Sequence, residues 1–253
     1  MTCFVLNDIF SFMSLTWEAE VRLRSNEGQG IPGRKILIIA PHADDEVLGC
    51  GGLIAKQTAR GDEVHLVIAA VGGNRQRHLA SAPSIEERWS EALVAADILG
   101  ISKVVALYEG YDMRMDTVPK VELVTKIDAI LDSAAFSEIY LPCSSHNHDH
   151  EVVLHASLAA LRPAAHAYSP DLIAQYEYYY GWTQPPTQGG KMYVDITFDL
   201  EVKARAMEAY GSQVRQGSHP ASLEAIRTLA AMRGLEAGFK YAELFYVLKF
   251  IKP

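Results

Sequence analysis

The sequence predicts an α/β protein of three layers, in which helices cover both faces of a mostly parallel sheet. The first observation is an apolar run at 36–40, which ends at Pro41 and leads into a glycine-rich segment that continues as a helix. Apolar runs without alternation are typical of strands buried on both faces. The second observation is that further apolar runs at 63–70, 103–108 and 137–142 are separated by stretches with helical spacing. Strands that alternate with helices indicate parallel βαβ units.

The other elements continue this alternation. Ser84 to Glu87 forms a capping box that starts a helix ending near Leu99, and 118–131 is an amphipathic helix. Strands are expected at 172–180, 192–197 and 239–251, and a helix at 199–213. Residues 1–34 are a poorly defined N-terminal extension, for which a surface helix is one interpretation, and 35–253 form a single domain.

Composition narrows the class of protein. A chain of 253 residues suits one large α/β domain. The net charge of −8 and the absence of a Lys/Arg run argue against a nucleic-acid partner, and no apolar run is long enough to span a membrane. Cys3, Cys50 and Cys143 are an odd count without C-x-x-C spacing, which indicates reduced thiols and a cytoplasmic location. The composition is compatible with a homo-oligomer.

The first strand leads into a dense group of polar residues. His42, Asp44, Asp45 and Glu46 fall within five positions directly after the apolar run and Pro41. Loops at the carboxyl ends of strands build the site in an open α/β sheet, and adjacent acids repel one another unless a positive charge lies among them. A divalent metal supplies that charge, with His42 and Asp45 as ligands and Asp44 as a base. The alternative is a solvated turn, because acids favour helix N-termini.

A second polar group follows the strand at 137–142. The segment 143–151 contains His146, His148 and His150 just before a helix with apolar spacing. Because both groups follow strands of one parallel sheet, they can face one crevice. Together they supply two histidines and one aspartate, a common catalytic metal set with an open coordination position. The alternative is a solvated histidine-rich loop without a ligand.

These motifs carry a family resemblance that spans about 35–252. P-H-A-D-D-E at 41–46 resembles the P-H-x-D-D-E signature of the LmbE-like, or PIG-L, family of zinc-dependent N-deacetylases. Ala43 replaces a proline often found there, at a position that makes no ligand. The resemblance implies a Rossmann-like fold with the active site at the carboxyl ends of the strands. It also implies Zn²⁺, or another divalent metal, and removal of acetyl groups from N-acetylglucosamine units.

The resemblance also assigns residues. It implies His42, Asp45 and His150 as metal ligands and Asp44 as the general base. It places Asp149 beside a histidine that this aspartate orients. Asp112 matches an aspartate that hydrogen-bonds sugar hydroxyls. Asn147 stands where many members have a histidine, so Asn147, His148 or His146 is expected to stabilise the oxyanion, with Asn147 in contact with the substrate and His148 pointing away.

Further candidates for substrate contact come from the residues themselves. Arg88 lies near a helix N-terminus, where it opposes the macrodipole, so an anionic or hydroxyl partner is expected. The alternative is a surface arginine paired with Glu91 or Asp112. The loop residues Asn74 and Arg75 are further candidates to face a substrate. The aromatic-rich segment 176–186 is either a wall of a sugar cleft or part of the core.

The sequence has features of two other classes of function. A Rossmann-type nucleotide-binding protein fits a glycine-rich helix after a strand, but the third glycine of G-x-G-x-x-G is missing after Gly49 and Gly51. The acids in that turn would also repel pyrophosphate. A catalytically inactive sugar-binding domain of the same fold is the other alternative, against which the intact acids and histidines count.

Overall fold

The computed structural model describes residues 19–22, 33–73, 81–178, 183–187 and 189–252. Its strands are β1 (Ala19–Arg22), β2 (Lys35–His42), β3 (Glu63–Val71), β4 (Lys103–Glu109), β5 (Glu138–Pro142), β6 (Ser144–Ser145), β7 (Leu172–Tyr176), β8 (Thr183–Gln184), β9 (Gly190–Asp195) and β10 (Ala242–Phe250). Its helices are α1 (Asp45–Ala59), α2 (Ile85–Leu99), η2 (Met115–Thr117), α3 (Lys120–Asp132), α4 (His148–Ala160), α5 (Leu200–Ala209) and α6 (Leu223–Ala237).

The main sheet is mostly parallel, as predicted. Within the described residues its strand order is β1-β4-β3-β2-β5-β7-β10-β9. The five central strands from β4 to β7 are parallel. β1 pairs antiparallel with β4 at one edge, and at the other edge β10 pairs antiparallel with both β7 and β9. The chain starts the parallel part at β2 and builds outward in one direction to β4, then in the other from β5. Ligands bind doubly wound sheets at such a switch point, outside the carboxyl ends of the strands.

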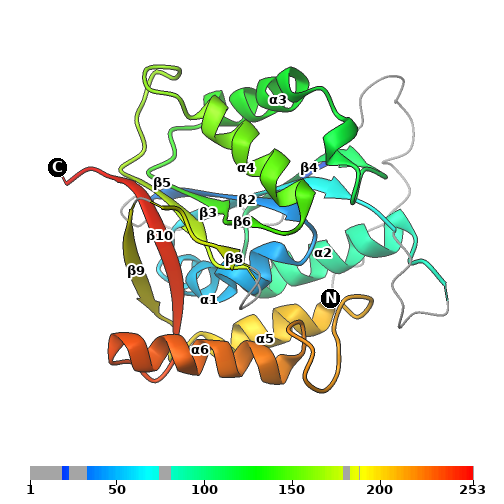
Figure 1. The fold of residues 1–253 in the computed structure, drawn as a ribbon, viewed down its shortest axis with the longest axis vertical. Helices are drawn as coiled ribbons and strands as arrows, with labels where there is room; N and C mark the ends of the chain where they lie inside the picture. The colour runs from blue at the N-terminus through cyan, green and yellow to red at the C-terminus, as the bar shows by residue number, and fades with distance from the viewer. Residues whose placement is uncertain (1–18, 23–32, 74–80, 179–182, 188, 253) are drawn as a thin grey trace.

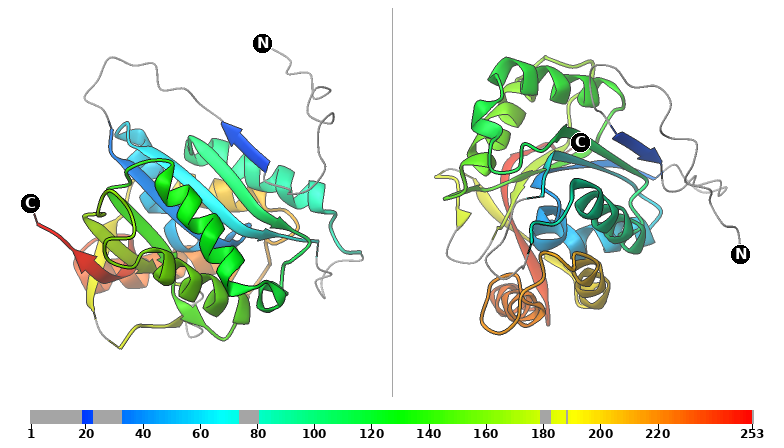
Figure 2. Two further views of the ribbon diagram at one scale, coloured as in Figure 1. Left: turned by 90° about the horizontal axis from the view of Figure 1, so that it is seen from above. Right: turned by 90° about the vertical axis from the view of Figure 1, so that its right-hand side faces the viewer.

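Helices cover both faces of this sheet (Figure 1). α3 and α4 pack on one face, and α1 and α2 pack on the other. α5 lies against α1 and α2 on the side away from the sheet, and α6 packs on α5 and β10 (Figure 2). The predicted three-layer α/β arrangement is therefore confirmed, with α5 and α6 added outside one helical layer.

The core lies on both faces of the central strands. In β2, Ile36, Ile38 and Ala40 join the apolar cluster under α1 and α2, while Leu37 and Ile39 join the cluster under α3 and α4. All five side chains are buried. Each face of the strand has its own apolar layer to meet, which explains why the sequence run lacks alternation.

Helix α1 starts earlier than the sequence suggested. Its first residue is Asp45, so the acids form its first turn and the glycines lie inside the helix rather than opening it. Packing requires a glycine at position 49, because a Cβ there would lie 2.2 Å from the ring of Tyr176. The missing side chain lets α1 approach β7 closely, which brings the helix N-terminus over the strand ends.

Some regions differ from the sequence predictions. The described part of the N-terminal extension, Ala19–Arg22, is a strand paired with β4 rather than a surface helix. α6 was not predicted, although Ser222 caps it by accepting from the Ala225 N–H at 3.1 Å and Gly238 ends it with a φ of 79°. Tyr179 and Tyr180, the predicted end of a strand, lie outside the described residues. None of the helices in the described part of the chain combines the length and apolarity of a membrane span.

Candidate active site

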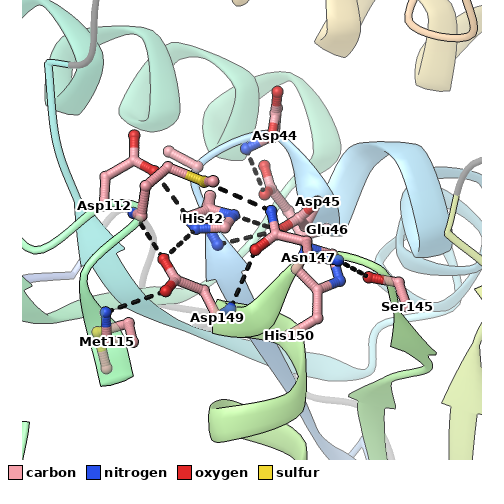
Figure 3. Close-up of polar contacts among 12 residues, drawn as sticks. His42, Asp44, Asp45, Glu46, Asp112, Met115, Ser145, Asn147, Asp149 and His150 are labelled. Atoms are coloured by element: carbon pink, nitrogen blue, oxygen red, sulfur yellow. Dashed lines mark hydrogen bonds and ion pairs between the residues drawn. The ribbon is translucent and has the colours of Figure 1, made fainter. Parts of the chain in front are cut away.

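The two polar clusters meet at the switch point of the sheet (Figure 3). His42 is the last residue of β2 and Asp45 is the first residue of α1. His150 lies in the first turn of α4, the helix that follows β5 through the short strand β6. β2 and β5 are parallel neighbours, so their carboxyl ends bring the three side chains together. Ligand atoms of His42, Asp45 and His150 all lie within 4.8 Å of one another.

This group fits a divalent metal. The three residues are 8%, 1% and 0% exposed for His42, Asp45 and His150. Within the described chain, neither ring nitrogen of His150 has a hydrogen-bond partner, and its Nε2 lies 3.3 Å from Asp45 Oδ2. Buried polar atoms are nearly always paired, so these nitrogens need a partner that is not a side chain. Two imidazoles and one carboxylate are a donor set of catalytic zinc sites.

Asp149 supports the group from behind. Its Oδ2 lies 2.8 Å from His42 Nε2, and its carboxylate accepts from the backbone N–H groups of Met113 at 2.6 Å and Met115 at 3.0 Å. An Nε2–H donated to Asp149 leaves the Nδ1 lone pair of His42 facing Asp45, 3.3 Å away. Carboxylate partners orient metal-ligating histidines in this way. The same carboxylate anchors the loop that carries Asp112.

The adjacent acids Asp44 and Asp45 differ in proton affinity. Burial raises the pKa of Asp45, but the charges of the nearby His150 and His42 outweigh burial and lower that pKa below its usual range. Burial and the Asp45 carboxylate raise the pKa of Asp44 well above its ordinary value. Pairs of acids whose environments separate their pKa values have separate roles. Asp45 is suited to remain an ionised ligand, and Asp44 is suited to take up a proton.

The His42 imidazole is also polarised. Burial lowers its pKa, but hydrogen bonds to Asp149 and Asp45 outweigh burial and raise the pKa well above the ordinary value. A metal ion supplies the positive charge that these carboxylates otherwise draw from a proton on His42. The negative charge of these carboxylates therefore favours a metal ion, as does the set of two imidazoles and one carboxylate.

The three residues predicted to stabilise the oxyanion, His146, Asn147 and His148, lie shortly before His150 in the sequence. Asn147 caps α4, because its Oδ1 accepts from the Asp149 N–H at 3.0 Å, and its Nδ2 lies 3.6 Å from Met113 Sδ. His148 is 48% exposed and turns toward the Met113 carbonyl oxygen, 3.1 Å from its Nε2, and toward Asp149 Oδ1 at 3.3 Å. His146 Nδ1 lies 3.3 Å from Gln184 Nε2. Asn147 also meets the group directly, because its carbonyl oxygen accepts from the His150 backbone N–H at 3.1 Å.

The two predicted sugar-binding residues differ in setting. Asp112 belongs with the site, since its Oδ1 lies 3.3 Å from His42 Nε2 and its side chain is 15% exposed. Arg88 is only 3% exposed, so the alternative of a surface arginine is wrong, although its pairing with Glu91 at 3.1 Å is observed. It also donates hydrogen bonds to Ser212 Oγ and the Ala43 carbonyl oxygen. Contact between Arg88 and a sugar stays a prediction.

Tyr178 is a site residue that was not singled out from the sequence. Its ring lies 4.3 Å from that of His150, edge to face, and its backbone N–H donates to Thr183 Oγ1 at 2.8 Å. Pairing of β6 with β8 ties this segment to the second cluster. The density of aromatic residues was the available signal, but it did not separate Tyr178 from Tyr176, which is fully buried in the core. Asn74 and Arg75 lie outside the described residues.

Known proteins resemble this chain in sequence and in structure. The diacetylchitobiose deacetylase of Thermococcus kodakarensis is 29% identical over 228 residues, covering 83% of this chain and 81% of that protein. A solved structure of N,N'-diacetylchitobiose deacetylase from Pyrococcus horikoshii, with its inhibitor MPG, has a TM-score of 0.69 and 26% identity, covering 85% of this chain and 84% of that one. A 4-oxalmesaconate hydratase of Pseudomonas putida is 26% identical over 160 residues, covering 60% of this chain and 61% of that protein.

A family model covers both polar clusters. It is described as PIG-L, GlcNAc-PI de-N-acetylase, and it matches residues 37–161, a span that includes His42, Asp45 and His150. The fold, the strand-end position of these residues and the matched span agree with one another. The chain thus matches the PIG-L (LmbE-like) family model over both polar clusters and is similar to diacetylchitobiose deacetylases along most of its length.

Proposed function

We propose that the protein is a zinc-dependent hydrolase that removes the N-acetyl group from an N-acetylglucosamine-type sugar or sugar conjugate, giving a free amine and acetate. The observation that carries this proposal is the buried group of His42, Asp45 and His150 at the switch point of the sheet, with Asp44 beside it. Deacetylases among the related proteins support the amide chemistry.

His42, Asp45 and His150 would hold the metal, with Asp149 fixing the orientation of His42. When bound, a divalent metal supplies Lewis-acid chemistry, which lowers the pKa of a water molecule and polarises a carbonyl oxygen. The protein contributes the fixed donor set and its burial.

Asp44 moves the proton in this proposal. It accepts a proton from the attacking water as the water oxygen bonds to the acetamide carbonyl carbon. The carbon–nitrogen bond then breaks, and the protonated Asp44 gives that proton to the nitrogen of the leaving amine. A carboxyl whose pKa is raised by burial suits both halves of this exchange.

Residues near the metal group would bind the rest of the substrate. The Asn147 amide is the proposed donor to the oxyanion, with His148 as the alternative. Among the described residues, the Asn147 Nδ2 has only the Met113 sulfur, 3.6 Å away, as its acceptor. Asp112 is proposed to accept hydrogen bonds from sugar hydroxyls. Tyr178 is proposed to form an aromatic wall next to His150.

The proposal is tested by mass spectrometry on a panel of N-acetylated sugars with small and large carriers. We expect each accepted sugar to lose one acetyl group, with an equal amount of acetate released. Sugars that bind without losing acetyl would indicate an inactive sugar-binding domain and contradict the proposal. Hydration of an unsaturated substrate without any acetate release would place the chain with its hydratase relative instead.

The proposed setting is the cytoplasm. The described cysteines, Cys50 and Cys143, are both free and buried, as is typical of proteins in a reducing compartment. The proposed partner is the N-acetylated sugar and not nucleic acid, since the chain carries a net charge of −8.

A further inference from the structure

One peptide group beside the metal site is held at both of its polar ends. The carbonyl oxygen of the Ala43–Asp44 peptide accepts from Arg88 Nη2. The N–H of the same peptide donates to Glu46 Oε2 at 3.1 Å. Arg88 is 3% exposed and Glu46 is 0% exposed, so both contacts are shielded from water. A buried positive side chain and a buried acid therefore hold the two ends of a single peptide unit.

Tyr210 connects these two side chains. Its hydroxyl donates to Glu46 Oε1 at 2.5 Å, and its ring lies 5.5 Å from Arg88 Cζ in a cation–π arrangement. Tyr210 is itself fully buried at the end of α5. Three elements converge on the loop after β2 and supply one side chain each: α2 supplies Arg88, α1 supplies Glu46 and the end of α5 supplies Tyr210. Together these three side chains form a peptide clamp.

The clamped peptide precedes a strained residue. Asp44 has φ 124° and ψ −24°, a conformation that residues with a side chain rarely adopt. Such strain costs on the order of 1–3 kcal/mol and persists only where surrounding structure imposes it. Relaxing φ of Asp44 requires rotation of the Ala43–Asp44 peptide, which would break the hydrogen bonds to Arg88 and Glu46.

The strain affects what the Asp44 carboxylate does. An aspartate at this position normally accepts from an N–H of the first helical turn. Asp44 occupies the N-cap position of α1, but its side chain makes no capping hydrogen bond. The Asp44 carboxylate is therefore not engaged in the cap of α1.

We propose that Arg88, Glu46 and Tyr210 are positioning residues that fix the Ala43–Asp44 peptide and thereby aim the Asp44 carboxylate at the proton it accepts. This inference rests on the proposed function for the role of Asp44 as base. It assigns Arg88 to the orientation of the base rather than to the sugar, so loss of Arg88 acts on kcat and not on KM.

Steady-state kinetics of the zinc-loaded protein test the clamp. Glu46→Met removes the acceptor for the Asp44 N–H, while Glu46→Gln keeps an oxygen at that place. We expect Glu46→Met to lower kcat by roughly 10- to 100-fold, because small displacements of a catalytic group have effects of this size. KM and the zinc content should stay at wild-type values. Glu46→Gln should recover most of the lost kcat, and Tyr210→Phe should fall between the two.

A matched control separates positioning from loss of a buried acid. Glu138 is also a buried carboxylate, but it lies at the amino end of β5, where it binds Arg34 and Tyr140. Glu138→Gln should keep wild-type kcat whatever its effect on stability. Arg88→Lys tests the sugar alternative, because the clamp predicts a lower kcat with unchanged KM. A raised KM with unchanged kcat in Arg88→Lys would overturn the assignment of Arg88.

A crystal structure of Glu46→Met provides a readout independent of activity. The clamp predicts that Asp44 leaves the region near φ 124° in this variant. Retention of that angle together with wild-type kcat would overturn the proposal, and Tyr210→Phe decides in the same way if Glu46→Met does not fold. A wild-type protein without deacetylase activity would contradict the proposed function alone, since the Asp44 angle in the variants still tests the clamp.

Discussion

Asp44 and Asp45 are neighbours in the sequence, yet their surroundings give them opposite tendencies. Asp45 lies against His42 and His150, which lower its pKa, whereas burial and Asp45 itself raise the pKa of Asp44. Residues of one type that differ in this way are suited to different chemical tasks. The division into ligand and base can therefore be tested one side chain at a time.

Exchange of each acid for its amide separates the two roles. Asp44→Asn should keep zinc while kcat falls by roughly 10²- to 10⁴-fold, the usual effect of losing a general base. Asp45→Asn is the matched variant and should lose zinc, because it replaces a ligand. Elemental analysis and kinetics of both proteins check this. Loss of zinc from Asp44→Asn with retention in Asp45→Asn would reverse the assignment.

The oxyanion donor can be separated from the helix cap at Asn147. Asn147→Asp keeps an oxygen that can accept from the Asp149 N–H but removes the amide donor, so stability should hold while kcat falls by roughly 10- to 1000-fold. His148→Ala should stay near wild type, because that side chain turns toward the Met113 carbonyl. Kinetics and thermal melts of both variants provide the measurement. A large loss of kcat in His148→Ala beside an active Asn147→Asp would make His148 the donor.

Local sequence patterns predicted some of these residues and not others. His42, Asp44 and Asp45 could be found because they are adjacent and follow an apolar run. The clamp could not, because Tyr210 lies 164 residues beyond Glu46, and its hydroxyl meets that acid only after α5 has packed on α1. The burial of Arg88 has the same origin, since its partner Ser212 lies 124 residues away.

At the scale of elements, the site depends on where strands end and helices begin. His42 ends β2, while Asp45 and His150 lie in the first turns of α1 and α4. The strands of the parallel core could be predicted because each is a buried apolar run bounded by polar residues. The exact start of α1 could not, because glycines are poor helix formers and only close packing of Gly49 on Tyr176 explains them.

The ends of α3 and α4 are joined by His166. Its Nδ1 lies 2.7 Å from Asp132 Oδ1, and its Nε2 lies 3.0 Å from the Ala160 carbonyl oxygen. Both ring nitrogens therefore face acceptors, which suits a protonated imidazole. Burial lowers the pKa of His166, but the hydrogen bonds to Asp132 and Ala160 outweigh burial and raise it.

This arrangement predicts a pH-dependent contribution to stability. A raised pKa in the folded state means that the contribution is complete below the ordinary histidine value of 6.5 and is lost as pH rises through the raised pKa. His166→Gln should therefore lower the free energy of unfolding more at about pH 5.5 than at about pH 8.5, by up to ~1 kcal/mol. Denaturant titrations of both proteins at each pH measure the difference, with the exposed His155→Gln as control. An equal loss at both pH values would contradict the prediction.

At the scale of the whole molecule, one sheet organises both the core and the site. β2 and β5 are its central neighbours, and their carboxyl ends deliver the two polar clusters to the same place. The resulting metal group joins α1 on one face of the sheet to α4 on the other. The fold class could be predicted because its signal is repeated along the chain, whereas α6 and the edge strand β1 contribute single elements outside that repeat.

The most direct measurement of the central claim follows acetyl loss as zinc is returned to metal-free protein. An N-acetylated sugar accepted by the native enzyme is incubated with chelator-treated protein at rising zinc concentrations, and the product is measured by mass spectrometry. We predict no product without metal and a rise that saturates at about one zinc per chain, as for a catalytic site with three protein ligands. His42→Ala and His150→Ala should give no such rise. Deacetylation that persists in metal-free protein, or that zinc restores fully in His150→Ala, would contradict the account.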